Sequence, residues 1–213
     1  MKHFLILFFS FLPFAGITQS KTDFVDYEQL NTQFLEFLAK SKIDQYRIMK
    51  GLDKLRSDSM LLLPACDHSE FMLSNNKLTH FQKRGAKHDP QRRFDFFGID
   101  NVQAGENVLY IPINTLLKVE YQKDPLEIKT YEDLAEAVAK AWRHSKPHYA
   151  NILTEEFTVT ALCIRIDKKT EMLWATQAFG QVVGEHELTK TNESFPYESF
   201  YSHVKKKLKK TSH

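Results

Sequence analysis

The segment from Tyr131 to about Arg143 constrains the fold most, because it is the best-marked helix in the sequence. Thr130 and Asp133 stand at the spacing of a capping box, in which each side chain accepts a hydrogen bond from the other residue's backbone amide. Apolar residues follow at helical spacing and form one face: Leu134, Val138, Ala141 and Trp142. The sequence therefore predicts an amphipathic helix that covers a core and ends in a loop containing Ser145.

The other elements flank this helix in an order that indicates the fold class. The spacing of apolar residues predicts helices at residues 26–49 and 57–76. Strands are predicted at residues 106–111, 157–166 and 172–179, and the last two form a hairpin. The order is helices, a strand, a helix and a hairpin. This order favours an α+β fold, with an antiparallel sheet covered by helices, over a parallel doubly wound sheet.

The first 20 residues predict a secretory signal peptide. A positive charge at Lys2 precedes an apolar run that is short for a membrane span, and small or polar residues follow at Thr18 to Ser20. A retained anchor helix is the alternative, and Pro13 and Gly16 argue against it. No cysteine lies near the cleavage zone, which argues against a lipoprotein anchor. We expect a secreted or periplasmic protein with no transmembrane segment in the mature chain.

Length and charge set the remaining limits. The 213 residues fit one domain at residues 21–180, with a basic extension at residues 181–213. The net charge of +2 is nearly balanced and gives no reason to expect a nucleic-acid partner. The run KKKLKK at residues 205–210 is most simply a solvated tail.

Cys66 and Cys163 are the only cysteines, one in a predicted helix and one in a predicted strand. An exported protein permits a disulfide between them. Apolar neighbours on both sides favour the other interpretation, in which each is a small buried hydrophobic residue. The sequence leaves both interpretations open.

Several short motifs occur in a fixed order along the chain. They are ACDHSEFM at 65–72, Thr79-His80, AGEN at 104–107, WRHSKPHYANIL at 142–153 and TQAFG at 176–180. In this order the chain resembles the CAP superfamily, also called SCP domains, and is most similar to its short bacterial members. The superfamily comprises the cysteine-rich secretory, antigen 5 and pathogenesis-related 1 proteins. The resemblance covers about residues 26–180 and implies a three-layer α-β-α sandwich with a small antiparallel sheet and a central cavity.

The resemblance also implies a set of site residues. In many members of the superfamily two histidines and two acidic residues line the cavity and can hold a divalent metal. His80 matches the loop histidine, Glu106 matches the acid of G-E-N, and His148 matches the second histidine. Ser145 stands at the position of the second acid, so one carboxylate is missing. The first-helix motif H-N-x-x-R is also incomplete, because only Asn31 remains of it.

Chemistry alone supports a weak version of this site. Two imidazoles and one carboxylate can form a three-ligand zinc site with an open position, and the missing carboxylate lowers the expected affinity. The spacing H-E-x-x-H of an ordinary zinc protease does not occur. A serine triad of Ser145, His148 and Glu106 is disfavoured, since no nucleophile elbow surrounds the serine.

Each candidate also has a structural interpretation. Glu106 could bind loop amides, and His148 could hydrogen-bond across its loop. His68 could face the pocket together with Ser145, although a hydrogen-bonded core histidine is the more common case. His88, Arg92 and Arg93 are expected on a solvated loop within residues 79–100.

Two classes of function remain. The resemblance favours a non-enzymatic secreted module that binds a lipid, a sterol or another cell-envelope or extracellular partner, with a weak divalent-metal site. The alternative is a metal-assisted, peptidase-like hydrolase that uses His80, His148 and Glu106, with a metal-bound water as nucleophile.

Overall fold

The computed structural model describes residues 19–113, 116–117 and 126–185. The sheet has four strands in the order β1-β5-β6-β2. Strands β2 (Val102–Pro112), β5 (Val159–Asp167) and β6 (Met172–Val182) pair antiparallel, as the sequence predicts. The edge strand β1 (Arg56–Ser57) was not predicted and pairs parallel with β5. Two short strands, β3 (Leu116–Leu117) and β4 (Leu126–Glu127), form a separate ladder.

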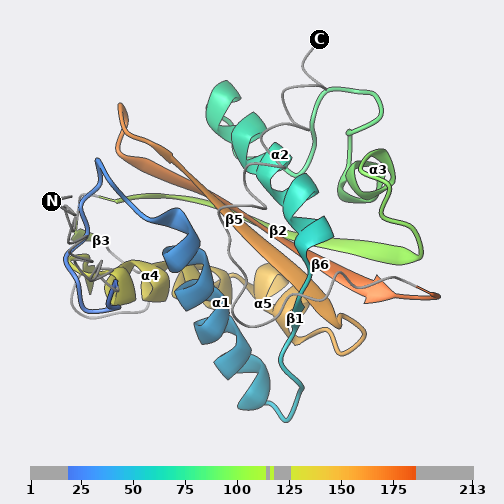
Figure 1. Cartoon of the computed structure of the whole chain (residues 1–213), viewed down its shortest axis with the longest axis horizontal. Coiled ribbons are helices and arrows are strands. Elements are labelled where there is room, and N and C mark those ends of the chain that lie inside the picture. Colours follow the sequence, from blue (N-terminus) through green and yellow to red (C-terminus); the bar gives the residue numbers. More distant parts are fainter. Residues whose placement is uncertain (1–18, 114–115, 118–125, 186–213) are drawn as a thin grey trace, which may run out of the picture.

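Helices cover both faces of the sheet and make a three-layer α-β-α sandwich (Figure 1). On one side lie α1 (Thr32–Ile48), α4 (Tyr131–His144) and α5 (Lys146–Leu153), and on the other lie α2 (Ser59–Asn75) and α3 (Pro90–Phe96). Strand β5 separates two hydrophobic clusters, because its residues alternate between the faces. Leu162 and Ile164 pack with α1 and α4, whereas Ala161 and Cys163 pack with α2. The predicted α+β sandwich is therefore confirmed.

Local capping explains where the helices begin. The capping box of Thr130 and Asp133 is formed at the start of α4, as predicted. Helix α1 begins later than predicted, because the Asn31 side chain accepts a hydrogen bond from the amide of Phe34 at 3.1 Å. Asp58 caps α2, because its side chain accepts a hydrogen bond from the amide of Met60 at 2.8 Å. Pro64 is accommodated inside α2.

Helix α5 occupies residues for which the sequence predicted only a loop. Ser145 ends α4 and begins α5 in an extended conformation, so the chain changes direction there. Pro147 lies in the first turn of α5, where its missing N–H leaves no helical hydrogen bond unmade. The prediction of a loop was therefore wrong, because Pro147 stands at the start of a second helix.

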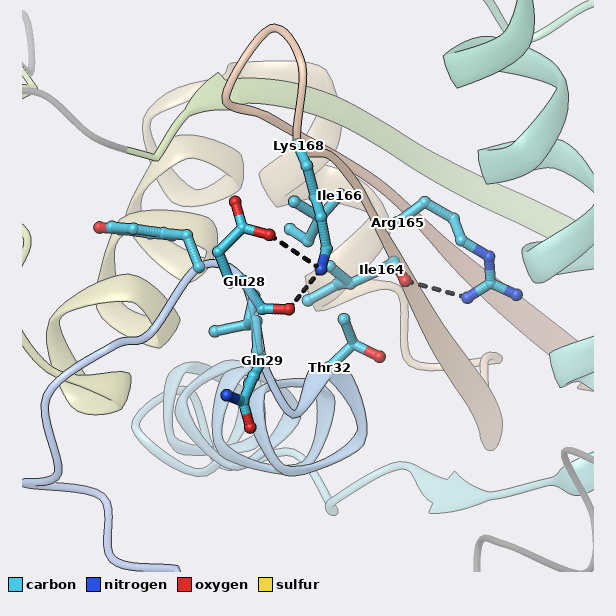
Figure 2. Close-up of a pocket in the computed structure, with 9 residues that line it drawn as sticks. Glu28, Gln29, Thr32, Ile164, Arg165, Ile166 and Lys168 are labelled. Carbon is cyan, nitrogen blue, oxygen red and sulfur yellow. Dashed lines mark hydrogen bonds and ion pairs between the residues drawn. The ribbon is translucent and has the colours of Figure 1, made fainter.

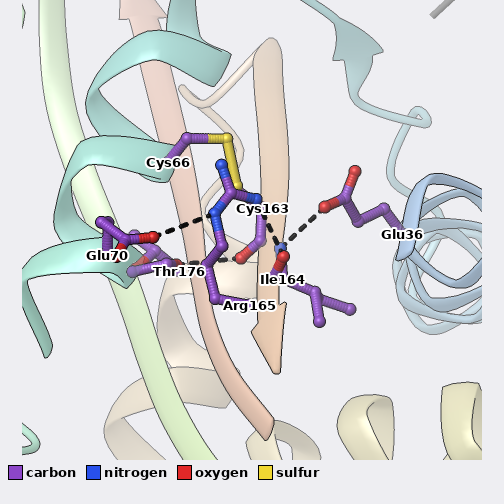
Figure 3. Close-up of a disulfide and its surroundings, with 8 residues drawn as sticks. Glu36, Cys66, Glu70, Cys163, Ile164, Arg165 and Thr176 are labelled. Atoms are coloured by element: carbon purple, nitrogen blue, oxygen red, sulfur yellow. Dashed lines mark hydrogen bonds and ion pairs between the residues drawn. A yellow bond between two sulfur atoms is a disulfide. The ribbon is translucent and has the colours of Figure 1, made fainter. Parts of the chain in front are cut away.

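A disulfide joins α2 to β5 through Cys66 and Cys163, whose Cα atoms are 5.1 Å apart (Figure 3). Both cysteines are fully buried. The favoured interpretation as two separate thiols is wrong, because α2 lies directly over β5 and brings together residues 97 positions apart. Nearby, the Ser69 hydroxyl donates a hydrogen bond to the Cys163 carbonyl at 3.0 Å and reinforces the same contact.

No helix in the ranges that the structure describes is long and apolar enough to cross a membrane. The predicted signal peptide and basic tail fall almost entirely at residues 1–18 and 186–213, outside those ranges.

The disulfide provides a first test of the fold. Reduction of the wild-type protein should lower its free energy of unfolding by about 4 kcal/mol, because the crosslink closes a long loop in the unfolded chain. Denaturant unfolding with and without a reducing agent measures this loss. The Cys66→Ala/Cys163→Ala variant is the control, since the reductant should leave it unchanged. Alkylation of free thiols in the unfolded, unreduced wild type would contradict the crosslink.

Candidate functional site

The carboxylate of Glu106 lies at the centre of the candidate site. Glu106 belongs to β2 opposite Ala178 of β6, and its side chain is only 4% exposed. One carboxylate oxygen, Oε2, pairs with the guanidinium of Arg93. The other, Oε1, lies 3.0 Å from Nδ1 of His80 and 3.6 Å from Nε2 of His68. Both oxygens of Glu106 are thus engaged inside the protein.

Arg93 is the residue of this site that the sequence analysis missed. It lies on α3 and is 1% exposed, so its predicted place on a solvated loop is wrong. Its guanidinium also donates to the backbone carbonyls of His80 and Lys87 at 3.2 and 3.4 Å. The signal was the spacing of Phe94 and Phe97, which places Arg93 on the inward side of a short helix. Arg92 and His88 behave differently: Arg92 is exposed, and His88 is half-buried with Nδ1 donating to the carbonyl of Gln82.

His68 lies beneath the cluster and is fully buried. Its Nε2 donates to the carbonyl of Thr79 at 2.7 Å, and its Nδ1 accepts from the side-chain amide of Gln82 at 3.3 Å. These partners require a neutral ring that carries its proton on Nε2. Burial lowers the pKa of His68, although the Glu106 carboxylate acts in the opposite direction. His68 therefore anchors the loop that carries His80.

His80 and His148 lie side by side at the surface above Glu106. Their ring centroids are 6.3 Å apart, and the His80 side chain is 42% exposed. The contact with the carboxylate places a proton on Nδ1 of His80, which leaves Nε2 unprotonated in the neutral ring. Burial, followed by the neighbouring His80, lowers the pKa of His148. The two imidazoles are thus the accessible part of the site.

Two asparagines position His148 by fastening α5 to β2. The side-chain amide of Asn107 donates to the carbonyl of His148 at 3.0 Å. The amide of Asn151 donates to the backbone carbonyl of Glu106 at 3.0 Å and to Oδ1 of Asn107 at 2.9 Å. Hydrogen bonds from the side chains of Asn107 and Asn151 therefore link the segments A-G-E-N and Y-A-N-I-L directly.

Ser145 occupies the junction of α4 and α5 without a side-chain capping bond. Its amide donates to the carbonyl of Trp142, and its carbonyl accepts from the amide of Tyr149. The position of the second acid is thus filled by a residue whose backbone forms the turn. No contact links its hydroxyl to His148 or Glu106 among the residues described.

The structure brings His80, Glu106 and His148 together, but the arrangement suits a metal poorly. A metal ligand needs a free lone pair directed at the ion, and the oxygens of Glu106 face Arg93 and His80 instead. Within the described ranges no group of three His, Cys, Asp or Glu side chains could hold a metal ion. Two imidazoles remain as the donor set, and Glu106 orients His80 through its other ring nitrogen.

One pocket of about 230 Å³ lies away from this cluster, between the segment before α1 and the end of β5 (Figure 2). Lys168 crosses it, contacting the carbonyl of Glu28 and approaching its carboxylate at 3.4 Å. The ion pair satisfies the charges on both sides. This pocket therefore adds no chemical group to the candidate site.

Comparisons with known proteins identify the family. Residues 40–179 match "CAP: Cysteine-rich secretory protein family", which is more than half of the chain, so the chain belongs to this family. No curated protein matches the sequence.

Three similar solved structures come from bacteria. An outer surface protein from Borrelia burgdorferi has a TM-score of 0.56 at 14% identity, and the match covers 72% of this chain and 96% of that protein. An extracellular protein with an SCP domain from Bacillus anthracis gives 0.49 at 20% identity, covering 70% and 40%. A cysteine-rich secretory protein from Staphylococcus aureus gives 0.46 at 13% identity, covering 71% and 40%. The likeness to the Borrelia burgdorferi protein concerns the fold alone.

The buried ion pair makes a direct prediction. Arg93→Leu should lower the free energy of unfolding by about 3–5 kcal/mol, because it leaves the Glu106 carboxylate buried without its cation. Denaturant unfolding is the measurement, and Arg92→Leu is the matched control, expected to change stability by no more than about 0.5 kcal/mol.

A second variant separates charge from shape. In Arg93→Leu/Glu106→Leu no charge remains uncompensated, so part of the lost stability should return. Equal losses in Arg92→Leu and Arg93→Leu would show that the pair does not stabilise the fold.

Proposed function

We propose that this CAP-domain protein is a secreted, non-enzymatic binding module for a lipid, a sterol or another component of the cell envelope. The observation that carries the proposal is the engagement of Glu106. Both oxygens of this carboxylate contact internal partners, Arg93 and His80, in a side chain that is 4% exposed. A group held in this way acts as a fixed anchor for its neighbours. It is poorly placed to accept a proton from a substrate or a water molecule.

The accessible groups of the site support recognition of a partner. His80 and His148 are partly exposed, whereas Glu106, Arg93 and His68 beneath them are buried. The buried residues fix the positions of the two imidazoles through hydrogen bonds. Fixed polar groups at a surface reduce the ordering cost of binding, which favours a recognition role.

The alternative function is a metal-assisted hydrolase with His80, His148 and Glu106. One observation favours it: the carboxylate of Glu106 contacts Nδ1 of His80, so Nε2 is the ring nitrogen left for another partner, and the ring lies next to His148. The same hydrolase would also need a carboxylate directed at the substrate side, and the contacts of Glu106 direct it inward. Peptidase activity that is lost in Glu106→Ala but retained in a folded control would favour this alternative over the binding module.

A weak divalent-metal site is the second part of the proposal. Two imidazoles leave the remaining coordination positions to water, so zinc affinity should be modest. Zinc at about 50 µM should raise the melting temperature of the wild type by a few degrees, because a ligand that binds only the folded state stabilises it. The gain should disappear in His80→Ala/His148→Ala and persist in His144→Ala. No gain in the wild type, or the same gain in the double variant, would remove the metal site.

The lipid role is tested by what the protein carries. Protein purified from the medium of expressing cells should yield a lipid or sterol in an organic extract, or bind a fluorescent sterol or fatty acid saturably. Mass spectrometry of the extract and a fluorescence titration are the measurements. An empty extract together with titrations that do not saturate would contradict the lipid and sterol forms of the proposal.

A further inference from the structure

A second pocket of about 400 Å³ lies on the side of the sheet that α2 and α3 cover. The end of α2, helix α3 and the loop of residues 82–87 surround it. Phe71 from α2 and Phe96 from α3 give it aromatic walls, and Lys83, Arg84 and Lys87 bring positive charge from the loop. Phe96 is 39% exposed, which is a high value for a large aromatic ring. The pocket thus joins an apolar lining to a basic rim.

The acids near this pocket already have partners. The carboxylate of Asp67 pairs with the ammonium group of Lys87 at 2.7 Å and accepts a hydrogen bond from the side-chain amide of Gln82 at 2.8 Å. Glu70 pairs with Arg165, Asp89 with Arg92, and Asp95 accepts a hydrogen bond from Gln91. These acids therefore leave the remaining cations of the rim uncompensated.

Lys83 and Arg84 are those remaining cations. Both are exposed, and within the part of the chain that the structure describes neither has a hydrogen-bond or ion-pair partner. Their positive charge is available to an anionic ligand. Arginine and lysine together are the usual protein partners of phosphate oxygens.

The loop that carries these cations is held in place. The amide of Gln82 donates to the carbonyl of His88 at 2.8 Å, and Nδ1 of His88 donates back to the carbonyl of Gln82 at 2.9 Å. Asp67 fastens both ends of the loop through Gln82 and Lys87, and Arg93 binds the carbonyl of Lys87. The rim is thus largely formed before a ligand arrives, which lowers the entropic cost of binding.

Lys87 connects the charged and aromatic parts. Its ammonium group lies 5.3 Å from the centre of the Phe96 ring while it pairs with Asp67. A ligand could therefore place an anionic group against Lys83 and Arg84. An apolar portion of the same ligand would then contact Phe71 and Phe96.

From these observations we infer that the pocket between α2, α3 and residues 82–87 binds a phosphoester whose apolar portion contacts Phe71 and Phe96. The source of this chemistry is either a soluble phosphoester or the head group of an anionic phospholipid. The inference rests on the binding role proposed above and names a ligand class for it, at a site separate from His80 and His148.

Phenyl phosphate is a probe for the soluble form, measured by calorimetric titration of the full mature chain. Lys83→Glu/Arg84→Glu should weaken its binding at least tenfold. Lys50→Glu/Lys54→Glu is the matched control, because it reverses two exposed charges outside the pocket and should leave the affinity unchanged. No saturable binding of phenyl phosphate or of the vesicles below, or equal weakening in both double variants, would overturn the inference.

Phe96→Ala tests the apolar portion. It should weaken phenyl phosphate while leaving the affinity for inorganic phosphate unchanged, provided its circular dichroism matches the wild type. If both affinities change equally, the aromatic contact is wrong and the pocket takes an anion alone, which overturns the inference as stated.

Vesicles separate the two sources. The lipid head group is assigned if the protein binds phosphatidylcholine vesicles that contain phosphatidylglycerol but not vesicles of phosphatidylcholine alone. This vesicle binding should be lost in Lys83→Glu/Arg84→Glu and kept in the control variant. Binding of phenyl phosphate without vesicle binding assigns a soluble phosphoester. If the wild type and Lys83→Glu/Arg84→Glu yield the same amount of lipid, the proposed function stands. The assignment of this pocket as the binding site would then be wrong.

Discussion

A carboxylate buried in the sheet is the constraint on which the site depends. Moving an ionised carboxylate out of water costs several kcal/mol unless an opposite charge and hydrogen bonds compensate it. Glu106 obtains this compensation from Arg93 on α3 and from His80 on the preceding loop. Segments with little regular structure thereby become fixed against β2. The same contacts determine which ring nitrogen of His80 faces outward, so the accessible chemistry follows from the buried pair.

A second buried arginine has a comparable role on the other face of the sheet. Arg47 of α1 is 2% exposed and donates to the carbonyls of Ile152 and Thr154, at the end of α5. The last carbonyls of a helix have no partners within it, so this cation satisfies groups that would otherwise be buried without a donor. Arg47 and Arg93 each convert an irregular segment into a fixed one through carbonyl contacts. Helix α5, and with it His148, is held by Arg47 at one end and by Asn107 near the other.

Sequence patterns predicted what local periodicity and capping determine. The capping box at Thr130 and the hairpin of β5 and β6 follow from patterns within short segments, whereas the three-layer sandwich was implied by the resemblance to the CAP superfamily. The same resemblance, carried by the order of the motifs, implied that His80, Glu106 and His148 belong to one site. Pairings between distant segments could not be predicted in this way. The disulfide forms because α2 lies over β5, which no local pattern shows. Arg93 is buried because it pairs with the carboxylate of Glu106 on β2, 13 residues further along the chain.

Arg93 also changes what the missing second acid means. In a site with several carboxylates, the negative charges repel one another and a bound cation relieves them. Here Ser145 contributes no charge, and the guanidinium of Arg93 neutralises Glu106 from inside. Because this cation belongs to the chain, it cannot dissociate, and the positions of Glu106 and His80 do not depend on a bound ion. The loss of one acid and the presence of a buried arginine are thus two parts of one charge balance. That balance fixes His80 through Glu106 and leaves the imidazoles of His80 and His148 side by side and partly exposed at the surface.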